Sequence, residues 1–232
     1  MQRFHALVFD LDDTLYPERE FVRSGFSAVA LWAQEHLGLD GSRSFASLWA
    51  LFERGVRGNT FDLWLEEEGV APAGHVKEIV GVYRNHTPAI SAYPDVSRAL
   101  DLFRPGHRLG IVSDGDPEIQ LRKLRALGLG SYFDAVVVSD MPGVQARKPS
   151  PKPFHAVLDR LGVHGEKAVY IADNPLKDFA GARAAAMSTV RVRRPGGLYS
   201  QSEAPSEAYE PDLEVESMSA LTALIEQSPA ST

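Results

Sequence analysis

Short apolar runs that stop abruptly at a polar residue recur along the chain and are its most informative pattern. Three of them lead directly into an aspartate or a serine: Ala6–Phe9 before Asp10, Leu109–Val112 before Ser113, and Ala168–Ala172 before Asp173. Because the runs are continuous rather than alternating, they predict strands buried on both faces of a parallel sheet. Residues 136–138 and 189–192 are two further candidate strands.

Helical patterns separate these predicted strands. The segment 117–127 has its apolar residues at helical spacing, between a capping residue, Asp116, and a stop signal, Gly128. The apolar residues in question are Ile119, Leu121, Leu124 and Leu127. Helices are also predicted at 151–161, 176–187 and 218–226, an exposed loop at 200–210, and a frayed end at 228–232. Strands that alternate with helices of this size predict an α/β fold with a doubly wound, Rossmann-like parallel sheet.

The segment 17–87 differs in kind, because it lacks a convincing strand and carries all three tryptophans. Its first part has helical apolar spacing, and helical stretches follow around 45–52, 61–65 and 76–83. We therefore predict an α/β core formed by residues 1–16 and 88–232, with an all-helical domain of residues 17–87 inserted after the first strand. Trp32, Trp49 and Trp64 are predicted to form the packed core of that insertion.

Composition narrows the classes of function. The 232 residues include 24 Lys+Arg and 31 Asp+Glu, a net charge of −7, with 44% hydrophobic residues and no cysteine. A negative chain without a basic, aromatic-rich run is a poor candidate for binding nucleic acid. Its apolar runs are too short for a membrane span, and the amino terminus lacks the pattern of a signal peptide. We expect a cytoplasmic protein without disulfides or cysteine chemistry.

The polar residues at the strand ends are candidates for one site. In an open parallel sheet, ligands bind beyond the carboxyl ends of the strands, where Asp10, Ser113 and Asp173 are predicted to meet. Asp12 returns to the same side as Asp10 if the backbone stays extended. Clustered carboxylates repel one another, and a hard divalent cation removes that repulsion. Oxygen ligands without cysteine or a histidine cluster favour Mg²⁺ over zinc.

Each motif alone also has a purely structural interpretation. Asp-x-Asp after a strand can be a helix cap or a turn, and the loop from Ser113 to Pro117 can be a simple helix start. Lys148 can be a solvated residue before a proline-initiated helix, and the aspartates of residues 173–178 can cap the next helix. Only their combination favours a phosphate site.

Four motifs in one order carry that combination. They are Asp10-Leu11-Asp12-Asp13-Thr14, Ser113, Lys148-Pro149-x-Pro151, and Asp173-Asn174 with Asp178. This pattern resembles the haloacid dehalogenase (HAD) superfamily of phosphohydrolases, in the phosphoglycolate phosphatase-like subgroup with a helical cap inserted between the first two motifs. The resemblance covers nearly the whole chain. One departure is Ala172, where the family often has glycine.

The resemblance implies a role for each matching residue. Asp10 would be the nucleophile and Asp12 the general acid and base, while Lys148 would neutralise charge on Asp10 and the phosphate. The implied phosphate-binding residues are Ser113, with its hydroxyl, Asp114 and Gly115, in the loop whose backbone N–H groups assist, and Lys148. The implied Mg²⁺ ligands are the carboxylates of Asp10 and Asp173 and the backbone carbonyl of Asp12. Asp178 would be a supporting group or an alternate metal ligand, and Asn174 and Thr14 would support these groups.

We therefore expect an enzyme, a Mg²⁺-dependent phosphatase that hydrolyses a small phosphorylated metabolite through an aspartyl-phosphate. The alternatives are a phosphomutase acting on a sugar phosphate, a 2-haloacid dehalogenase, or a binding protein without catalysis. Asp12 argues against the dehalogenase, which resembles the chain less because it lacks that aspartate and needs no metal. We interpret Arg191, Arg193 and Arg194 as the charged end of a strand. A monomer and a homodimer are both compatible with the sequence.

Overall fold

A computed structural model describes residues 4–226 and divides the chain into two compact units. The first unit consists of Met1–Glu18 and Ser91–Thr232, and the second of Arg19–Ile90. The boundaries predicted from the sequence lie at 16/17 and 87/88, close to these divisions. The predicted frayed end at 228–232 lies outside the described residues.

The first unit is built on a parallel sheet of six strands in the order β3-β2-β1-β4-β5-β6. The strands are β1 (Ala6–Phe9), β2 (Arg108–Ser113), β3 (Ala135–Val138), β4 (Ala168–Ala172), β5 (Ser188–Val192) and β6 (Leu213–Val215). The central strand β1 is buried along its whole length, as its uninterrupted apolar run predicts. β6 was not predicted, because its first two residues are exposed and its three residues form no apolar run.

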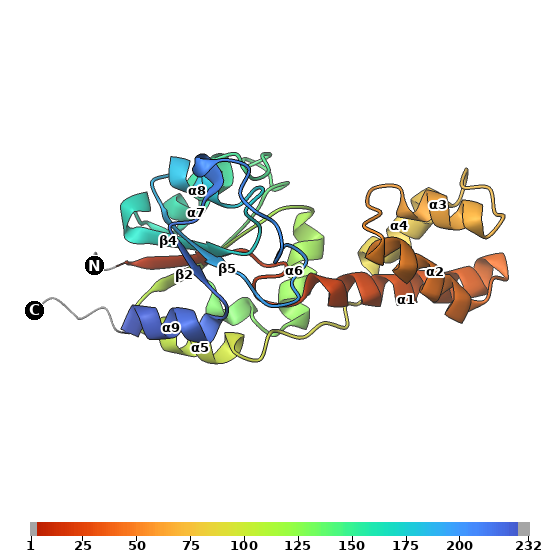
Figure 1. The fold of residues 1–232 in the computed structure, drawn as a ribbon, viewed down its shortest axis with the longest axis horizontal. Helices are drawn as coiled ribbons and strands as arrows, with labels where there is room; N and C mark the ends of the chain where they lie inside the picture. Colours follow the sequence, from red (N-terminus) through yellow and green to blue (C-terminus); the bar gives the residue numbers. More distant parts are fainter. Residues whose placement is uncertain (1–3, 227–232) are drawn as a thin grey trace, which may run out of the picture. The chain divides into compact units, whose positions relative to one another are not determined.

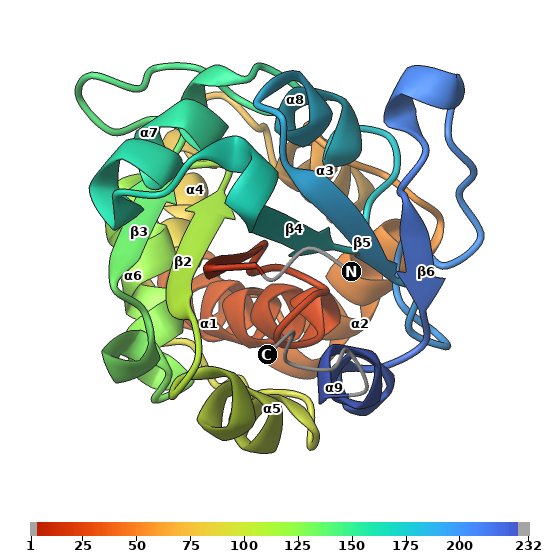
Figure 2. The same cartoon turned by 90° about the vertical axis from the view of Figure 1, so that its left-hand side faces the viewer.

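Helices cover both faces of this sheet, which confirms the predicted doubly wound α/β fold. Figure 2 shows α7 (Lys152–Leu161) and α8 (Phe179–Ala184) on one face, and α5 (Val96–Phe103) and α9 (Met218–Glu226) on the other. Successive side chains of β1 point to opposite faces of the sheet, so they pack against the helices on both faces. Ala6 and Val8 pack with the α7 and α8 side chains, whereas the ring of Phe9 stacks on Phe103 of α5 with centroids 6.3 Å apart.

Two helices differ from the sequence prediction. The segment 176–187 becomes helical only from Phe179, because residues 174–178 form a turn in which the Asp178 N–H donates to the Asn174 carbonyl. Helix α5 was not predicted. The other elements of this unit are α6 (Pro117–Ala126) and the 3₁₀ turns Gly130–Tyr132, Gly165–Lys167 and Glu207–Tyr209. None of the helices formed by residues 4–226 combines the length and apolarity needed to cross a membrane.

The second unit consists of helices. They are α1 (Glu18–Leu37), which starts at the last residue of the first unit, α2 (Gly41–Glu53), α3 (Thr60–Glu67) and α4 (Val76–Asn85) (Figure 1). Its core gathers around Phe26, whose ring contacts those of Phe52, Phe61 and Tyr83.

The three tryptophans of this unit do not share one environment. Trp64 is fully buried, which confirms the sequence prediction for this residue. Trp32 is only partly buried and stacks on His36. Trp49 is also partly buried and lies beneath the guanidinium groups of Arg19 and Arg23. The prediction of a tryptophan core is therefore wrong for Trp32 and Trp49. Aromatic spacing alone does not separate core positions from partly exposed positions at which the ring stacks on a histidine or lies under arginine side chains.

Helix α8 approaches the loop after Lys148 so closely that only glycine fits at position 181. A Cβ atom on Gly181 would lie 2.4 Å from the Pro149 carbonyl oxygen and 2.9 Å from that of Ser150. We expect Gly181→Ala to lower the free energy of unfolding by about 1–3 kcal/mol through overpacking, measured by urea denaturation. Gly130→Ala is the control, because a Cβ there meets nothing within 4 Å. Equal stability of the two variants would contradict the close approach.

Candidate active site

A tight turn after β1 positions the first motif. The N–H of Asp10 still donates to the carbonyl of Ile171 in β4, at 2.9 Å, so this residue continues the strand pairing. The chain then turns at Asp13, whose φ of 53° is left-handed, a conformation that aspartate tolerates better than most residues. The Asp13 carboxylate accepts hydrogen bonds from the N–H groups of Glu18 and Leu198 and so fixes the turn. Asp10 and Asp12 are thereby held at the side of the sheet where the strands have their carboxyl ends.

Lys148 lies at the centre of a buried cluster. Its side chain is 0% exposed, and its Nζ lies 2.9 Å from Asp10 Oδ1, 2.7 Å from Asp178 Oδ1 and 3.1 Å from the Tyr170 hydroxyl. Burial alone would lower the pKa of Lys148, but the carboxylates of Asp10 and Asp178 raise that pKa well above its usual range. The lysine is therefore a buried cation beside Asp10, and the interpretation as a solvated loop residue is wrong.

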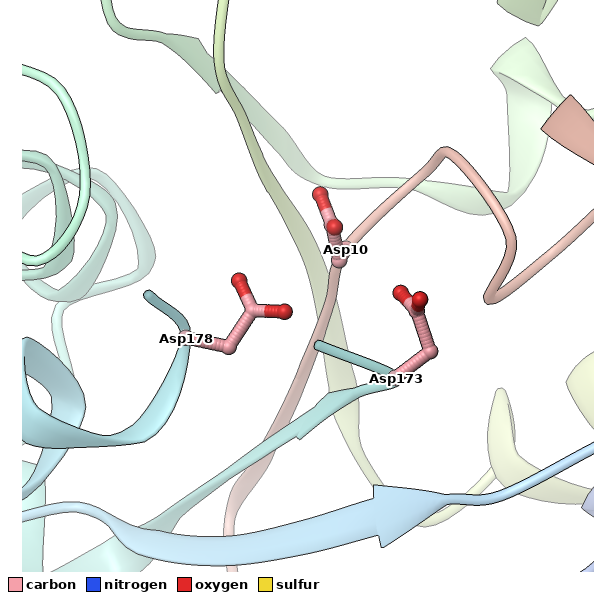
Figure 3. A group of neighbouring side chains, drawn as sticks. All are labelled: Asp10, Asp173 and Asp178. Atoms are coloured by element: carbon pink, nitrogen blue, oxygen red, sulfur yellow. The ribbon is translucent and has the colours of Figure 1, made fainter. Parts of the chain in front are cut away.

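Asp10, Asp173 and Asp178 form a buried carboxylate cluster (Figure 3). Each offers one oxygen, and these oxygens lie within 4.8 Å of one another. Asp173 Oδ1 accepts from the Thr14 hydroxyl at 3.0 Å, whereas its Oδ2 is buried without a hydrogen-bond partner among the described residues. A carboxylate oxygen buried without a donor is costly, so this atom fits a metal ligand.

Burial is the main cause that raises the pKa values of Asp10 and Asp173. Burial raises the pKa of Asp10 to about 6, although Lys148 opposes the shift. Burial, and then the charges of Asp178 and Asp10, raise the pKa of Asp173 well above its usual range. A cation bound between these groups would stabilise their charged forms. The cluster of all-oxygen donors could therefore hold a divalent metal ion.

Asp178 and Asn174, the other polar residues of the fourth motif, interact with neighbouring groups of the protein. Asp178 Oδ1 contacts Lys148, and its Oδ2 accepts from the Asn174 N–H at 3.0 Å. Asn174 Oδ1 accepts from the Leu176 N–H at 3.0 Å and shapes the turn before α8. The supporting roles of these two residues stay predictions. The predicted metal ligands and the carboxylate cluster share Asp10 and Asp173. The third predicted ligand is the backbone carbonyl of Asp12, whereas the third member of the cluster is Asp178.

Asp12 is surrounded by hydrogen-bond donors. Its Oδ1 accepts from the Tyr16 hydroxyl and lies 2.6 Å from Lys123 Nζ, while its Oδ2 accepts from Gln120 Nε2 at 3.1 Å. Burial alone would raise the pKa of Asp12, but the ammonium of Lys123 and the hydrogen bonds of these three side chains outweigh it and lower that pKa. The Asp12 carboxylate is therefore both charged and fixed in orientation.

The residues that were predicted to bind phosphate after β2 already make hydrogen bonds to other groups of the protein. Ser113 is 1% exposed, and its Oγ accepts from Gln120 Nε2 at 2.9 Å. The N–H of Gly115 donates to Ser139 Oγ at 2.9 Å, and Asp114 Oδ1 accepts from the Lys148 N–H at 3.0 Å. Phosphate binding at Ser113, Asp114 and Gly115 stays a prediction, and at Gly115 it requires exchange of the Ser139 bond.

The polar face of α6 was not predicted from the sequence. Leu121 was predicted to lie on the apolar face of this helix, yet it is 37% exposed, whereas Gln120 and Lys123 are buried. The available signal was a pair of polar residues three positions apart in a helix that begins directly after the Ser113 loop.

The interpretation of Arg191 as a charged strand end is also wrong. This side chain is 2% exposed and donates to the Asp173 carbonyl at 3.1 Å and to two carbonyls of the loop at 199–202. It therefore fixes the backbone beside Asp173.

Comparisons with known proteins agree with this arrangement. A model of the haloacid dehalogenase-like hydrolase family matches residues 4–186. Glyceraldehyde 3-phosphate phosphatase from Methanopyrus kandleri is 35% identical over 220 residues, which cover 91% of this chain and 92% of that protein. Ribulose-1,5-bisphosphate 5-phosphatase from Halopiger xanaduensis is 32% identical over 201 residues, covering 80% and 83%. A HAD phosphatase from Thermococcus onnurineus superimposes with a TM-score of 0.64 at 25% identity, covering 95% and 97%.

The family match spans the elements that form the site. Residues 4–186 run from β1 to the end of α8 and include all four motifs. The family predicted from the order of those motifs is thus confirmed. The chain belongs to the haloacid dehalogenase-like hydrolase family.

Proposed function

We propose that this protein is a phosphatase that hydrolyses a small phosphate monoester, with Asp10 as the nucleophile. The observation that carries the proposal is the Asp10 carboxylate, which lies 2.9 Å from a buried lysine. It belongs to one carboxylate cluster with Asp173, whose Oδ2 has no donor among the described residues. Two relatives that align over most of the chain are named as phosphatases of phosphorylated three-carbon and five-carbon compounds. A small phosphorylated metabolite is therefore the substrate class to test.

Two displacements at phosphorus account for the reaction. In the first, an Asp10 oxygen forms a bond to phosphorus while the bond to the alcohol oxygen breaks. A substrate bound as its monoanion gives its proton to the Asp12 carboxylate, and Asp12 passes this proton to the alcohol oxygen as that oxygen departs. In the second, water attacks phosphorus, Asp12 accepts its proton, and the Asp10 carboxylate leaves. Lys148 stabilises the negative charge that Asp10 and the phosphoryl group share.

We propose Mg²⁺ as the ion, because the donors at this site are hard oxygens. The carboxylates of Asp10 and Asp173 would hold it, with the backbone carbonyl of Asp12, and it would neutralise charge between the nucleophile and the phosphate. Thr14 orients Asp173 for this role, since its hydroxyl donates to Oδ1 and leaves Oδ2 for the ion.

Removal of the metal is expected to abolish phosphate release. With EDTA, release from a panel of phosphorylated metabolites should fall to background, and added Mg²⁺ should restore it. Without substrate, Mg²⁺ at about 100 times its dissociation constant should raise the thermal midpoint by roughly 5 °C, measured by calorimetry.

A matched pair of variants locates the ion. Asp173→Asn should remove most of the Mg²⁺-dependent rise in midpoint, whereas Glu66→Gln, an exposed acid of α3, should leave it unchanged. Phosphate release that persists in EDTA, or an unchanged Mg²⁺ effect in Asp173→Asn, would contradict the assigned metal site.

A further inference from the structure

Two buried side chains of α6, Lys123 and Gln120, converge on one carboxylate. We propose that they are positioning residues, which hold Asp12 in the orientation needed to give a proton to the departing oxygen of the substrate. This inference rests on the proposed function and deepens it, because it names residues outside the four motifs on which the first displacement depends.

The start of α6 fixes where these side chains lie. Asp116 caps the helix, since its Oδ1 accepts from the N–H groups of Glu118 at 2.8 Å and Ile119 at 3.3 Å, and Pro117 occupies the first turn. Gln120 and Lys123 are three residues apart and therefore share one face of the helix. Both are buried, with exposures of 4% and 5%. The cap thus sets the position of the face that meets Asp12.

Both oxygens of Asp12 are held, each by a different donor. Lys123 Nζ lies 2.6 Å from Oδ1, which also accepts from the Tyr16 hydroxyl, and Gln120 Nε2 donates to Oδ2 at 3.1 Å. A carboxylate held at one oxygen can rotate, whereas one held at both has a defined plane. The same Gln120 Nε2 also donates to the Asp114 carbonyl at 2.6 Å and lies 2.9 Å from Ser113 Oγ, so its two hydrogens serve three acceptors. One amide therefore lies between the predicted proton donor and the predicted phosphate-binding loop.

This arrangement is better suited to orientation than to stability. A buried ion pair often contributes no net stability, because the cost of removing two charges from water offsets their attraction. A catalytic group that is displaced by about 1 Å, however, can lose about 10²-fold in rate. The effect of losing Lys123 is therefore expected in the rate of proton transfer rather than in folding alone.

The leaving group supplies a readout for this role. An alkoxide needs a proton as it departs, whereas p-nitrophenolate is already a good leaving group. The constant kcat/KM reports all steps up to the departure of the alcohol. We expect Lys123→Met to lower kcat/KM about 10²-fold for an alkyl phosphate such as glycerol phosphate, and tenfold or less for p-nitrophenyl phosphate.

A double-mutant cycle separates this role from a structural one. Lys123→Met and Asp12→Asn are made singly and together, and kcat/KM is measured with both substrates in Mg²⁺. If Lys123 acts through the Asp12 carboxylate, its loss should cost less than about threefold in the Asp12→Asn background. Arg125→Met, at an exposed basic position of the same helix, is the control and should keep the wild-type constants.

Gln120→Leu tests the other carboxylate oxygen and gives a second route if Lys123→Met does not fold. It should show the same dependence on the leaving group and the same lack of further loss in Asp12→Asn. Equal losses for both substrates, or equal losses with and without the Asp12 carboxylate, would overturn the inference while leaving the phosphatase proposal intact. A folded wild-type enzyme that releases phosphate from no substrate would overturn both.

Discussion

Asp10→Asn is expected to lower phosphate release by about 10⁴-fold or more, because an amide oxygen cannot form the aspartyl-phosphate. The substitution preserves the size of the side chain and an oxygen that can accept from Lys148 Nζ, which lies 2.9 Å from Asp10 Oδ1. The fold should therefore survive. The measurement is steady-state phosphate release in Mg²⁺, compared between wild type and variant.

The thermal midpoint is the control for this experiment and should stay close to that of wild type. Asp134→Asn provides a matched substitution elsewhere on the first unit, where the aspartate pairs with Arg104 at 2.7 Å away from the four motifs. That variant should retain its turnover. An Asp10→Asn enzyme that kept most of its activity would remove Asp10 from the role of nucleophile.

The second large effect is expected at Lys148, where the loss of one cation leaves two carboxylates buried. Its ammonium is 2.9 Å from Asp10 and 2.7 Å from Asp178, and the exposures of these three side chains are 0%, 4% and 0%. Removal of one partner from a buried ion pair costs about 3–5 kcal/mol, because the remaining charge has no compensation. We expect Lys148→Met to lower the free energy of unfolding near pH 7 by about 3 kcal/mol, and turnover by at least about 10³-fold.

Lys152→Met is the matched control, because Lys152 is exposed at the start of α7, in the same stretch of chain. Urea unfolding of both variants without metal gives the comparison, and phosphate release in Mg²⁺ gives the activity. A Lys148→Met protein as stable as Lys152→Met would mean that the cluster does not need this cation.

The sequence predicted the parts of the site that follow from strand ends. An uninterrupted apolar run that stops at a polar residue identifies a buried parallel strand and the side chain at its carboxyl end, so Asp10, Ser113 and Asp173 could be found without coordinates. Lys148 needed the resemblance to the family, because a lysine in a loop has no periodic signal. Its full burial arises from tertiary contacts with Asp10, Asp178 and Tyr170.

The residues around Asp12 could not be predicted in the same way. Gln120 and Lys123 lie on a buried face of α6, whereas the hydrophobic spacing predicts leucines at the buried positions. A polar residue is buried only where a partner satisfies its hydrogen bonds, and here that partner, Asp12, comes from a distant segment of the chain. Strand β6 and the buried Arg191 escaped detection for related reasons. The pairing of β6 with β5, and the carbonyls that surround Arg191, are long-range features without a local pattern.

The most direct test of the account is to detect a phosphoryl group on Asp10. Wild-type enzyme in Mg²⁺ is mixed with an excess of a phosphate monoester that it hydrolyses, quenched with acid within milliseconds, digested and examined by mass spectrometry. We expect a phosphorylated peptide containing Asp10 that forms faster than phosphate is released and disappears once the substrate is consumed. Phosphate release without phosphorylation of that peptide, or phosphorylation of another residue at the rate of turnover, would contradict it.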